Sequence, residues 1–460
     1  MARPAALEAG TLTELKSILG RHLVTDADVV ASYSQDRATF LTPGVAAVVA
    51  MPSSTEEVSA VVAVCARDGV PVVPRGAGSG LAGGANAVDG CVVLSTQRMN
   101  RVIEIDPNNL TAVVQPGVIN ADVKKAVGEY GLEYPPDPSS FEFCSIGGNI
   151  ATNAGGLCCV RYGVTRDYVL GLEVVLGDGS VLRTGRRTLK GVAGYDLTAL
   201  IVGSEGTLGV VTEATLRLRP KSHVPSTLVA FFGSVHDAGA AVAAVRRTLV
   251  PSLLELMDQR TVRAVEEWKH LGLDTNAAAM VLAQSDTGSE SPADVARMVE
   301  LCEAEGATGA VGARDEFESR MLVQARRLAI PAIERRGSWL LNDVGVPCAR
   351  VPDLVERVEE IAAATRIETF TFGHAGDGNM HPTMVFDPTD PSARDRTQQA
   401  HDEIVDAALD LGGTITGEHG VGTLKRSHLA RELGAGSIDL FGKIKESFDP
   451  AGILNPGKAF

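Results

Sequence analysis

The segment PRGAGSGLAGGANAVDG, residues 74–90, is dominated by glycine and precedes a short apolar strand pattern, CVVLS, at residues 91–95. Gly78, Gly80 and Gly83 spell GxGxxG, which marks a dinucleotide-binding turn when a helix begins at its end. Further glycines and a strand follow instead, so the pattern disfavours a nicotinamide site. Closely spaced glycines still allow backbone N–H groups to converge on an anion such as a pyrophosphate. A solvent-exposed loop is the alternative at this point.

Two further glycine-rich stretches follow, SIGGNIATNAGG at residues 145–156 and GSEGTLG at residues 203–209. Alternating apolar patterns around them predict hairpins at residues 101–117 and 169–185. Strands and glycine loops therefore dominate the chain to about Pro220. Three such loops in one chain favour an anion-binding role over three unrelated surface loops.

Beyond that point the pattern changes to strands that alternate with helices, which predicts a separate α+β domain with helices on one face of a sheet. The predicted strands are 228–232, 279–283, 339–344 and 368–373, and the predicted helices lie near 236–248, 292–305, 352–364 and 398–411. The last segment, 412–460, is again punctuated by glycine, and we expect it to return to the first domain.

Composition excludes several classes of function. The 57 acidic residues exceed the 42 Lys and Arg residues, giving a formal charge of −15 that argues against a nucleic-acid or anionic-membrane surface. Seven cysteines without a CxxC pair fit a reducing compartment and offer no iron–sulfur ligand set. The sequence shows neither a signal-peptide pattern nor an apolar run of membrane-spanning length. We therefore expect a cytoplasmic protein.

A histidine and glutamate cluster lies in the second half of the chain. The motif GHAGDGNMH predicts a hairpin that brings His374 and His381 to neighbouring strand ends. Glu418 and His419 lie in the segment GGTITGEHGVG, residues 412–422, where glycines flank them on both sides. Two imidazoles and one carboxylate are a plausible donor set for Zn²⁺ or Mn²⁺. A polar hairpin and a helix-capping loop without a metal are the alternative.

The order of the three glycine loops resembles the FAD-binding domain of the vanillyl-alcohol-oxidase, or PCMH, type over about residues 40–220. The motifs GHAGDGNMH, GEHGVG and LNPGK extend the resemblance to the glycolate oxidase flavin subunit and D-lactate/D-2-hydroxyglutarate dehydrogenase group. The resemblance implies an α+β protein: a PCMH-type FAD domain of two α+β subdomains, then a ferredoxin-like antiparallel-sheet substrate domain. The expected parts are a helical segment at 1–40, the FAD domain at 41–221, the substrate domain at 222–411 and a C-terminal segment at 412–460 that packs near the flavin.

The same resemblance implies where FAD binds. The first two glycine loops would wrap the pyrophosphate and ribityl chain, and the third would reach the adenine end. Some relatives attach FAD covalently through a histidine where this chain has Ser79, so we expect non-covalent FAD. The matching cofactor positions are Arg75, Gly76, Ala77, Gly78, Ser79, Gly80, Pro136, Ser139, Gly147, Gly148, Asn149, Asn153, Gly155, Glu205, Gly209, Val211 and Asn455.

The resemblance also implies an activity, the FAD-dependent oxidation of a D-2-hydroxy acid to the 2-oxo acid. Carried over to this chain, His374, His381 and Glu418 would hold a divalent Zn or Mn ion, and His419 would act as base. Hydride would pass from the substrate Cα to flavin N5, while the metal lowers the pKa of the hydroxyl group.

The substrate carboxylate needs a cationic anchor, for which the arginine fork is suited. The segment ARRLAIPAIE, residues 325–334, resembles the family segment that supplies it, with Arg326 as first choice and Arg327 as second. Thr383 is a further candidate for substrate contact. Relatives that take dicarboxylates carry polar or basic residues where this chain has Pro331 and Asn342, which favours D-lactate or glycolate over D-2-hydroxyglutarate.

Two other functions stay open from the sequence. One is a metal-dependent hydrolase without flavin, which would leave the three glycine loops unexplained. The other is a non-catalytic FAD-binding subunit of a dehydrogenase complex. The electron acceptor is equally open among a quinone, a cytochrome, an electron-transfer protein and O₂, and so is the oligomeric state, with a homodimer as one option.

Overall fold

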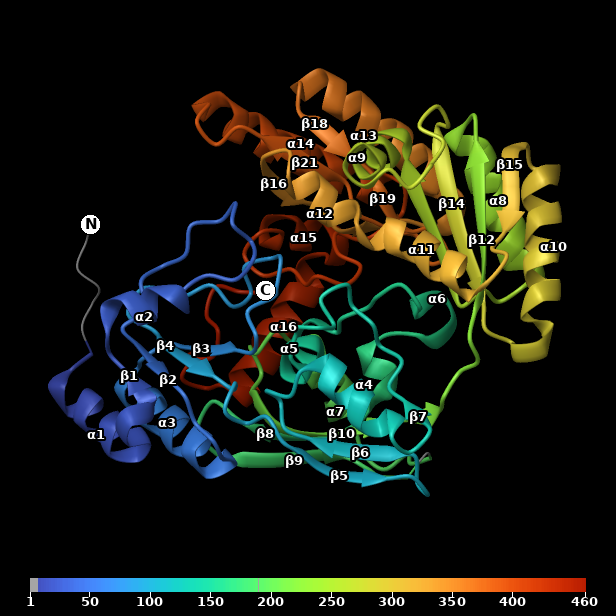
Figure 1. Cartoon of the computed structure of the whole chain (residues 1–460). Helices are drawn as coiled ribbons and strands as arrows, with labels where there is room; N and C mark the ends of the chain where they lie inside the picture. The colour runs from blue at the N-terminus through green and yellow to red at the C-terminus, as the bar shows by residue number, and fades with distance from the viewer. Residues whose placement is uncertain (1–6, 189) are drawn as a thin grey trace. The chain divides into compact units, whose positions relative to one another are not determined.

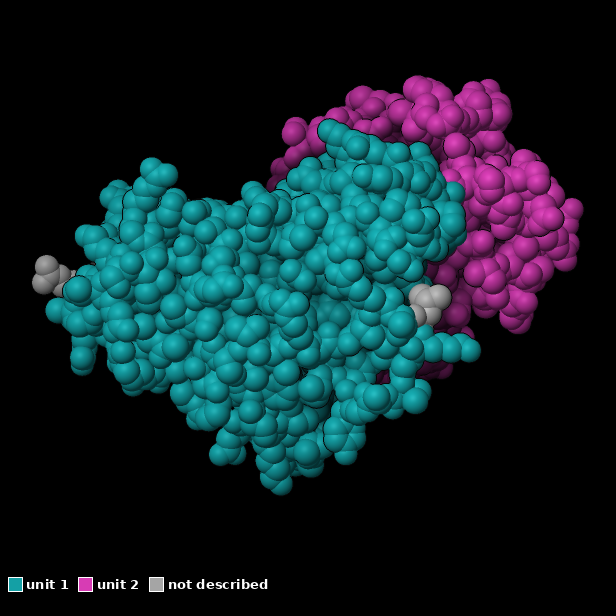
Figure 2. Space-filling view, turned by 90° about the horizontal axis from the view of Figure 1, so that it is seen from below, with its two compact units in different colours: residues 1–155, 164–221, 418–460 teal, residues 156–163, 222–417 magenta. Residues whose placement is uncertain are grey.

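The computed structural model describes residues 7–188 and 190–460 and divides the chain into two compact units (Figures 1 and 2). Unit 1 consists of three segments, residues 1–155, 164–221 and 418–460. Unit 2 consists of residues 222–417 with the short segment 156–163. The polypeptide therefore leaves unit 1 to build unit 2 and returns to complete the unit in which it began.

Unit 1 is built on two larger sheets. The first has the strand order β1-β2-β4-β3, with parallel pairing of β2 and β3 to β4 and antiparallel pairing of β1 to β2. Helices α1 and α3 pack on this sheet through Leu15, Val58, Val61 and Val62, all fully buried. The elements are α1 (Ala9–Leu19), β1 (Leu23–Val24), α2 (Ala27–Ser32), β2 (Val48–Ala50), α3 (Thr55–Asp68), β3 (Val72–Arg75) and β4 (Val92–Ser95).

The boundaries of α3 follow from its sequence. The Ser54 side chain accepts a hydrogen bond from the backbone N–H of Glu57, which satisfies one of the free donors of the first turn. Gly69 ends the helix in the left-handed conformation with φ of 67°. Strand β3 follows α3 after a short turn, and the first glycine loop begins where β3 ends.

The second sheet of unit 1 is antiparallel, with the order β5-β6-β10-β8-β9. Helices α4, α5 and α7 bury Val123, Val127, Ile146, Ile150 and Ile201 in the core beneath it. The elements are β5 (Val102–Asp106), β6 (Thr111–Val114), α4 (Asn120–Gly128), α5 (Ile146–Thr152), β8 (Val169–Val175), β9 (Val181–Gly185), α7 (Leu197–Ile201) and β10 (Val210–Arg217), with a small pair formed by β7 (Leu132–Glu133) and β11 (Arg219–Pro220).

The two predicted hairpins of this region are confirmed as β5–β6 and β8–β9. No helix follows Gly83, as the sequence predicts, because the chain passes through turns to β4. Asn120 is the first residue of α4 but does not cap the helix, although asparagine is a common capping residue. Its buried side chain instead donates to the carbonyl of Pro136 and to the side-chain oxygen of Asn149, which ties α4 to the start of α5.

Unit 2 is built on a seven-stranded sheet with the order β15-β12-β14-β13-β19-β20-β17. Its first four strands are antiparallel and have the 4-1-3-2 order of a ferredoxin-like sheet. A separate three-stranded sheet has the order β16-β21-β18. The strands are β12 (Ser226–Phe232), β13 (Leu253–Asp258), β14 (Ala279–Ser285), β15 (Ala307–Gly312), β16 (Ser338–Leu341), β17 (Val344–Gly345), β18 (Glu368–Phe370), β19 (Phe372–His374), β20 (Asn379–Met380) and β21 (Thr383–Phe386).

Helices cover both faces of the larger sheet, so the expectation of helices on one face is wrong. Helices α9, α11 and α12 pack with Val229, Met257 and Leu282 on one face. Figure 1 shows α8 and α10 on the opposite side of β12 and β14. The helices are α6 (Cys159–Tyr162), α8 (Val235–Thr248), α9 (Gln259–Lys269), α10 (Ser291–Ala304), α11 (Glu316–Arg327), α12 (Ala329–Glu334), α13 (Val351–Thr365) and α14 (Pro391–Asp410).

The C-terminal segment of unit 1 contains α15 (Leu429–Leu433) and α16 (Ala435–Phe448). After α16 it runs beside β3, where Leu454 forms a parallel bridge with Val72. The N–H of Val72 donates to the carbonyl of Ile453 and the N–H of Asn455 donates to the carbonyl of Val72, both at 2.8 Å. No helix among the residues that the structure describes combines the length and the apolar character needed to span a membrane.

Candidate functional site

A cavity of about 530 Å³ opens in unit 1 at the first glycine loop. This volume lies in the range of small-molecule and cofactor pockets. The predicted residues Arg75, Gly76 and Ala77 line it. Its remaining walls are Ser32, Tyr33, Gln97, Asn100, Gly117, Val118, Ile119, Asp122 and Ser145.

The first two glycine loops meet at Ser145. Its hydroxyl oxygen accepts hydrogen bonds from the N–H of Ala77 at 3.2 Å and of Gly148 at 3.3 Å. A Cβ at Gly76 would lie only 2.2 Å from that oxygen, and a Cβ at Gly147 would lie 2.6 Å from the Pro116 side chain. The absence of side chains at these two positions is therefore what lets the loops approach each other. Both N–H groups are engaged in this contact, so the donor that the junction offers to an anion such as a diphosphate is the hydroxyl proton of Ser145.

Arg75 supplies positive charge to the same cavity. Its side chain is buried, and its Nη1 atom has no hydrogen-bond partner among the described residues. A buried guanidinium nitrogen without a partner is costly unless a ligand satisfies it. Gly78 has φ of 73° and a Cβ there would lie 2.1 Å from the Arg75 guanidinium, so glycine is required beside it. The donor set of the cavity thus fits an anionic cofactor.

The other predicted cofactor residues of unit 1 have varied surroundings. The Asn149 side chain accepts from Asn120, the Asn153 side chain accepts from the N–H of Arg166, and the Asn455 side chain donates to the carbonyls of Gly84 and Glu205. Ser139 is exposed, Pro136 is buried and its carbonyl accepts from Asn120, and Gly209 packs closely on Val174. Of the predicted cofactor residues, Arg75, Gly76 and Ala77 alone line this cavity, and the rest, including Ser79, Gly80, Gly155 and Val211, do not.

Glu205 joins the C-terminal segment to the glycine loops. Its carboxylate accepts hydrogen bonds from the N–H groups of Val421 at 2.7 Å and Gly422 at 2.9 Å. Burial raises the pKa of Glu205 to about 7, although these two hydrogen bonds oppose the rise. A carboxyl group with this environment titrates near neutral pH, and its first structural task is to hold residues 421–422 in place.

The predicted hairpin in unit 2 is confirmed as β19–β20, in which His374 pairs with Asn379 and Gly373 with Met380. The tight turn between them needs Gly378, whose φ is 86° and whose Cβ would lie 2.0 Å from the carbonyl of Val346. His374 and His381 are both 3% exposed, and their ring centroids lie 5.0 Å apart. The hairpin therefore brings the two imidazoles together, as the sequence predicts.

A carboxylate stands behind each imidazole. Glu255 on β13 lies 2.7 Å from His374 Nδ1, and Asp343 lies 3.6 Å from His381 Nδ1. Burial favours the neutral form of Glu255, but His374 and Arg326 outweigh that effect, so the pKa of Glu255 is lowered overall. The other oxygen of Asp343 accepts from the Thr416 hydroxyl at 2.8 Å and the Gly417 N–H at 3.0 Å.

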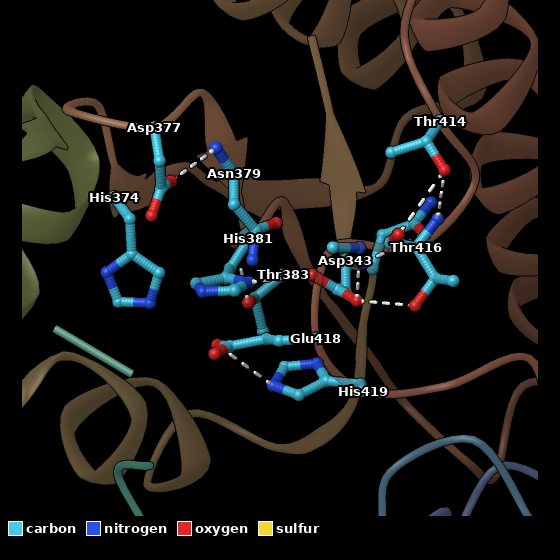
Figure 3. Close-up of polar contacts among 12 residues, drawn as sticks. Asp343, His374, Asp377, Asn379, His381, Thr383, Thr414, Thr416, Glu418 and His419 are labelled. Carbon is cyan, nitrogen blue, oxygen red and sulfur yellow. Dashed lines mark hydrogen bonds and ion pairs between the residues drawn. The ribbon is translucent and has the colours of Figure 1, made fainter. Parts of the chain in front are cut away.

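Glu418 is bonded directly to Gly417, so the same loop presents its carboxylate beside the two histidines (Figure 3). Potential ligand atoms of His374, His381 and Glu418 all lie within 4.8 Å of one another. His419 Nε2 lies 3.5 Å from Glu418 Oε1. Potential ligand atoms of His419, Asp343 and His381 also lie within 4.8 Å of one another. Two imidazole nitrogens and a carboxylate oxygen are donors that Zn²⁺ and Mn²⁺ accept.

The structure separates the two candidate arginines. Arg326 is 3% exposed and its Nε lies 2.7 Å from Glu255 Oε2, whereas Arg327 is exposed. The guanidinium of Arg326 also lies 4.7 Å from the ring centre of Phe372. Thr383 is fully buried, and its hydroxyl donates to the carbonyl of His381 at 3.1 Å.

Sequence reasoning missed Glu255, Asp343 and Ser145. Glu255 is the one charged residue before the end of an otherwise apolar run, LLELMD, and Asp343 ends another, WLLND. A charge inside an apolar strand pattern is a usable signal, since buried charges need partners. Ser145 stands directly before a glycine-rich helix start, where hydroxyl side chains cap free N–H groups.

Two family models match the chain. The model of the FAD binding domain matches residues 46–185, and the model of the C-terminal domain of FAD linked oxidases matches residues 221–459. The two matches fall on opposite sides of the change in sequence pattern near Pro220.

Similar proteins agree with these matches. The glycolate oxidase subunit GlcD of Bacillus subtilis is 45% identical, over 89% of this chain and 88% of that protein. A D-lactate dehydrogenase of Archaeoglobus fulgidus is 36% identical, over 89% of this chain and 90% of that protein. The structure of p-cresol methylhydroxylase superposes with a TM-score of 0.82 at 17% identity, over 99% of this chain and 98% of that one. The last comparison confirms the predicted PCMH-type fold.

Proposed function

The chain belongs to the FAD-linked oxidases, and we propose that it oxidises a D-2-hydroxy acid to the 2-oxo acid at a metal site formed by His374, His381 and Glu418. As a member of that family it is an FAD-dependent oxidoreductase that acts on CH–OH groups. The observation that carries the proposal is the convergence of the three ligand side chains within 4.8 Å. A FAD-binding fold alone would not account for that donor set.

We propose that the glycine cradle of unit 1 holds FAD non-covalently. The close approach of Gly76 to Ser145 supports a diphosphate at this position, and so does Arg75 Nη1, for which the described residues provide no hydrogen-bond partner. Bound FAD supplies the two-electron acceptor for the hydride that leaves the substrate Cα. Ser79 lacks a nucleophilic ring nitrogen for a covalent flavin bond. The full set proposed for the cofactor is Arg75, Gly76, Ala77, Gly78, Ser79, Gly80, Pro136, Ser139, Gly147, Gly148, Asn149, Asn153, Gly155, Glu205, Gly209, Val211 and Asn455.

His374, His381 and Glu418 would hold a Zn or Mn ion. Such an ion supplies Lewis-acid stabilisation of an alkoxide, which lowers the pKa of the substrate hydroxyl group. The hydrogen bond from His374 to Glu255 supports this role, because it commits Nδ1 and leaves Nε2 as the metal-binding atom.

We propose that His419 removes the proton of the substrate hydroxyl group and that Arg326 binds the substrate carboxylate. His419 is adjacent to the ligand Glu418 and is partly exposed, which leaves its ring accessible to a substrate. Arg326 is preferred over Arg327 because it is buried beside Glu255, the partner of His374. Thr383 is placed next to His381 and is a secondary substrate contact.

The names of two relatives and one buried residue support the proposed substrate class. One relative is a glycolate oxidase subunit and another a D-lactate dehydrogenase. Asn342 is fully buried, and its side chain donates to the carbonyl of His401 at 3.1 Å. Because that amide is already engaged, it is a poor anchor for a second carboxylate. We therefore place D-lactate and glycolate ahead of D-2-hydroxyglutarate.

None of the seven cysteines, all within the described residues, forms a disulfide, and we propose a cytoplasmic location, where thiols stay reduced. Electrons must leave the reduced cofactor for an external acceptor. A quinone, a cytochrome, an electron-transfer protein and O₂ are the candidates, and comparing reoxidation by O₂ with reoxidation by a soluble quinone would separate them.

The activity is tested by anaerobic flavin bleaching with the D and L forms of lactate and 2-hydroxyglutarate and with glycolate. We expect D-lactate or glycolate to bleach the flavin absorbance, and EDTA to slow bleaching by at least tenfold. Acid precipitation should release the yellow colour into the supernatant. Equal rates with D- and L-lactate, or bleaching by none of these acids, would contradict the proposal, and absence of flavin absorbance would favour a metal-dependent hydrolase.

The two histidine roles are separated by His374→Asn and His419→Asn. We expect His419→Asn to retain FAD and metal while flavin reduction falls by about 10²–10⁴-fold, the usual contribution of a general base. His374→Asn should lose metal first and keep FAD. Metal content and flavin absorbance are measured on the same samples, and an unaltered reduction rate in His419→Asn would remove it from the chemistry.

A further inference from the structure

Glu255 occupies an unusual position in the core of unit 2. It lies on β13, between β14 and β19 in the seven-stranded sheet, and is 1% exposed. One oxygen lies 2.7 Å from His374 Nδ1 and the other lies 2.7 Å from Arg326 Nε. A single carboxylate therefore bridges one proposed metal ligand and the proposed substrate anchor.

Arg326 depends on that carboxylate for its charge balance. It is 3% exposed, and the structure pairs it only with Glu255 and, through its planar face, with the Phe372 ring among the described residues. Phe372 precedes His374 by two residues on β19. The arginine, the carboxylate and the histidine strand thus form one packed unit.

We propose that Glu255 is a positioning residue that orients the imidazole of His374 for metal binding and, through its second oxygen, fixes Arg326 for the substrate carboxylate. This inference rests on the proposed function and adds a residue that neither binds the metal nor touches the substrate. Glu255 would therefore act on metal binding through His374 and on substrate binding through Arg326.

The chemical reason lies in what a carboxylate can accept. An ionised carboxylate accepts hydrogen bonds and donates none, so the His374 atom that faces it must carry the ring proton. The proton on Nδ1 leaves the lone pair on Nε2, the atom on the far side of the ring. A carboxylate behind a metal-ligating histidine also holds the ring plane and raises the basicity of the ligand.

Asp343 has a different relation to His381. Its Oδ1 lies 3.6 Å from His381 Nδ1, beyond hydrogen-bond distance, and its Oδ2 accepts from Thr416 and Gly417. That carboxylate anchors the loop before Glu418. Glu255 is therefore the carboxylate whose geometry controls a histidine directly.

The test uses the FAD-loaded protein, stripped of metal with EDTA and titrated with MnCl₂ by calorimetry. Glu255→Gln keeps the side-chain volume but cannot satisfy both partners, because its amide nitrogen would face either an N–H of His374 or the Arg326 guanidinium. We expect the affinity for Mn²⁺ to fall about 10- to 100-fold, the usual effect of removing such a partner. We also expect the KM for D-lactate to rise, because Arg326 loses its fixed position.

Asp258→Asn is the matched control. Asp258 is a buried carboxylate at the end of the same strand, but its oxygens accept from the N–H groups of Thr261 and Thr371. It should lose stability without a change in Mn²⁺ affinity. If Glu255→Gln and Asp258→Asn bind Mn²⁺ equally well, Glu255 has only a structural role and the inference fails while the proposed function stands.

Glu255→Gln leaves the buried Arg326 charge without its partner, which is strongly destabilising. The double variant Glu255→Gln with Arg326→Gln removes both charges, so it should recover thermal stability and still bind Mn²⁺ about 10- to 100-fold more weakly than the parent. Recovery of parental Mn²⁺ affinity in the double variant would overturn the inference. Failure of the parent protein to bind Mn²⁺ or Zn²⁺ would overturn the proposed metal site itself, and the inference with it.

Discussion

Close contacts at single glycines set the shape of the flavin cradle. The N–H groups of Ala77 and Gly148 both donate to the Ser145 hydroxyl oxygen, and Gly76 lies against that oxygen. A methyl group at residue 76 has no space unless Ser145 moves. Movement of Ser145 would release both N–H groups and widen the gap between the two loops.

We therefore expect Gly76→Ala to weaken FAD binding by roughly 5- to 150-fold, corresponding to an overpacking cost of about 1–3 kcal/mol. Flavin fluorescence on dilution measures the release. Gly128→Ala is the control, because no atom lies within 4 Å of a Cβ at that helical position. Equal FAD affinity in the two variants would show that the cradle tolerates a side chain.

Residue roles were only partly predictable from the sequence. The histidines and Glu418 could be grouped because they occur in short motifs that a hairpin and a loop bring together. Glu255 could not, because it lies 119 residues before His374 and only the pairing of β13 with β19 joins them. The preference for Arg326 over Arg327 came from the family pattern, and burial now gives it a physical reason.

At the scale of elements, the strand β13 and the helix α9 are joined by Asp258. Its side chain caps α9 through the N–H of Thr261 and also accepts from the N–H of Thr371. Burial raises the pKa of Asp258 to about 6, although these hydrogen bonds oppose the rise. An unperturbed aspartate titrates near pH 4.

This difference fixes the sign of a pH effect on stability. The folded state binds the proton more tightly, so the contribution of Asp258 is fully present below about pH 4 and is lost as the pH rises through about 6. At each pH we compare the Tm of the parent protein with the Tm of Asp258→Asn. We expect the difference, parent minus variant, to decrease by roughly 2–6 °C between pH 4.5 and 7. Differential scanning fluorimetry measures it, and a constant difference across that range would contradict the raised pKa.

Long periodic elements were predictable, and short or interrupted ones were not. The helix at residues 55–68 shows its cap, its apolar face and its terminal glycine in the sequence. Strand β13 was missed because its six residues carry charges at positions 255 and 258. Helix α14 begins at Pro391, seven residues before the prediction, because Asp390 caps it and the first turns face solvent with few apolar residues.

At the scale of the whole molecule, unit 1 depends on its last segment. The Asp449 carboxylate accepts hydrogen bonds from the N–H groups of Ile453 and Leu454 and pairs with Lys445. These bonds set the turn that brings Leu454 alongside Val72. Nothing in the local sequence pattern of residues 449–455 indicates that this segment pairs with a strand almost four hundred residues earlier.

We expect Asp449→Asn to lower the stability of unit 1 by about 1–3 kcal/mol, because buried N–H groups lose an acceptor. Thermal release of FAD, followed by flavin fluorescence, reports on unit 1 and should shift to lower temperature. Asp439→Asn is the control, since Asp439 is an exposed acid on α16. Coincident release curves for the two variants would argue against a structural role for the Asp449 turn.

The return of the chain to unit 1 has a consequence for how the protein is made. Residues 418–460 emerge from the ribosome only after the intervening 222–417 segment has been synthesised. At typical elongation rates the early strands wait on the order of ten seconds or more for the segment that pairs with β3. During that interval one edge of β3 is exposed to chaperones and to other nascent chains, so newly made polypeptide should capture FAD only after residues 418–460 have been synthesised.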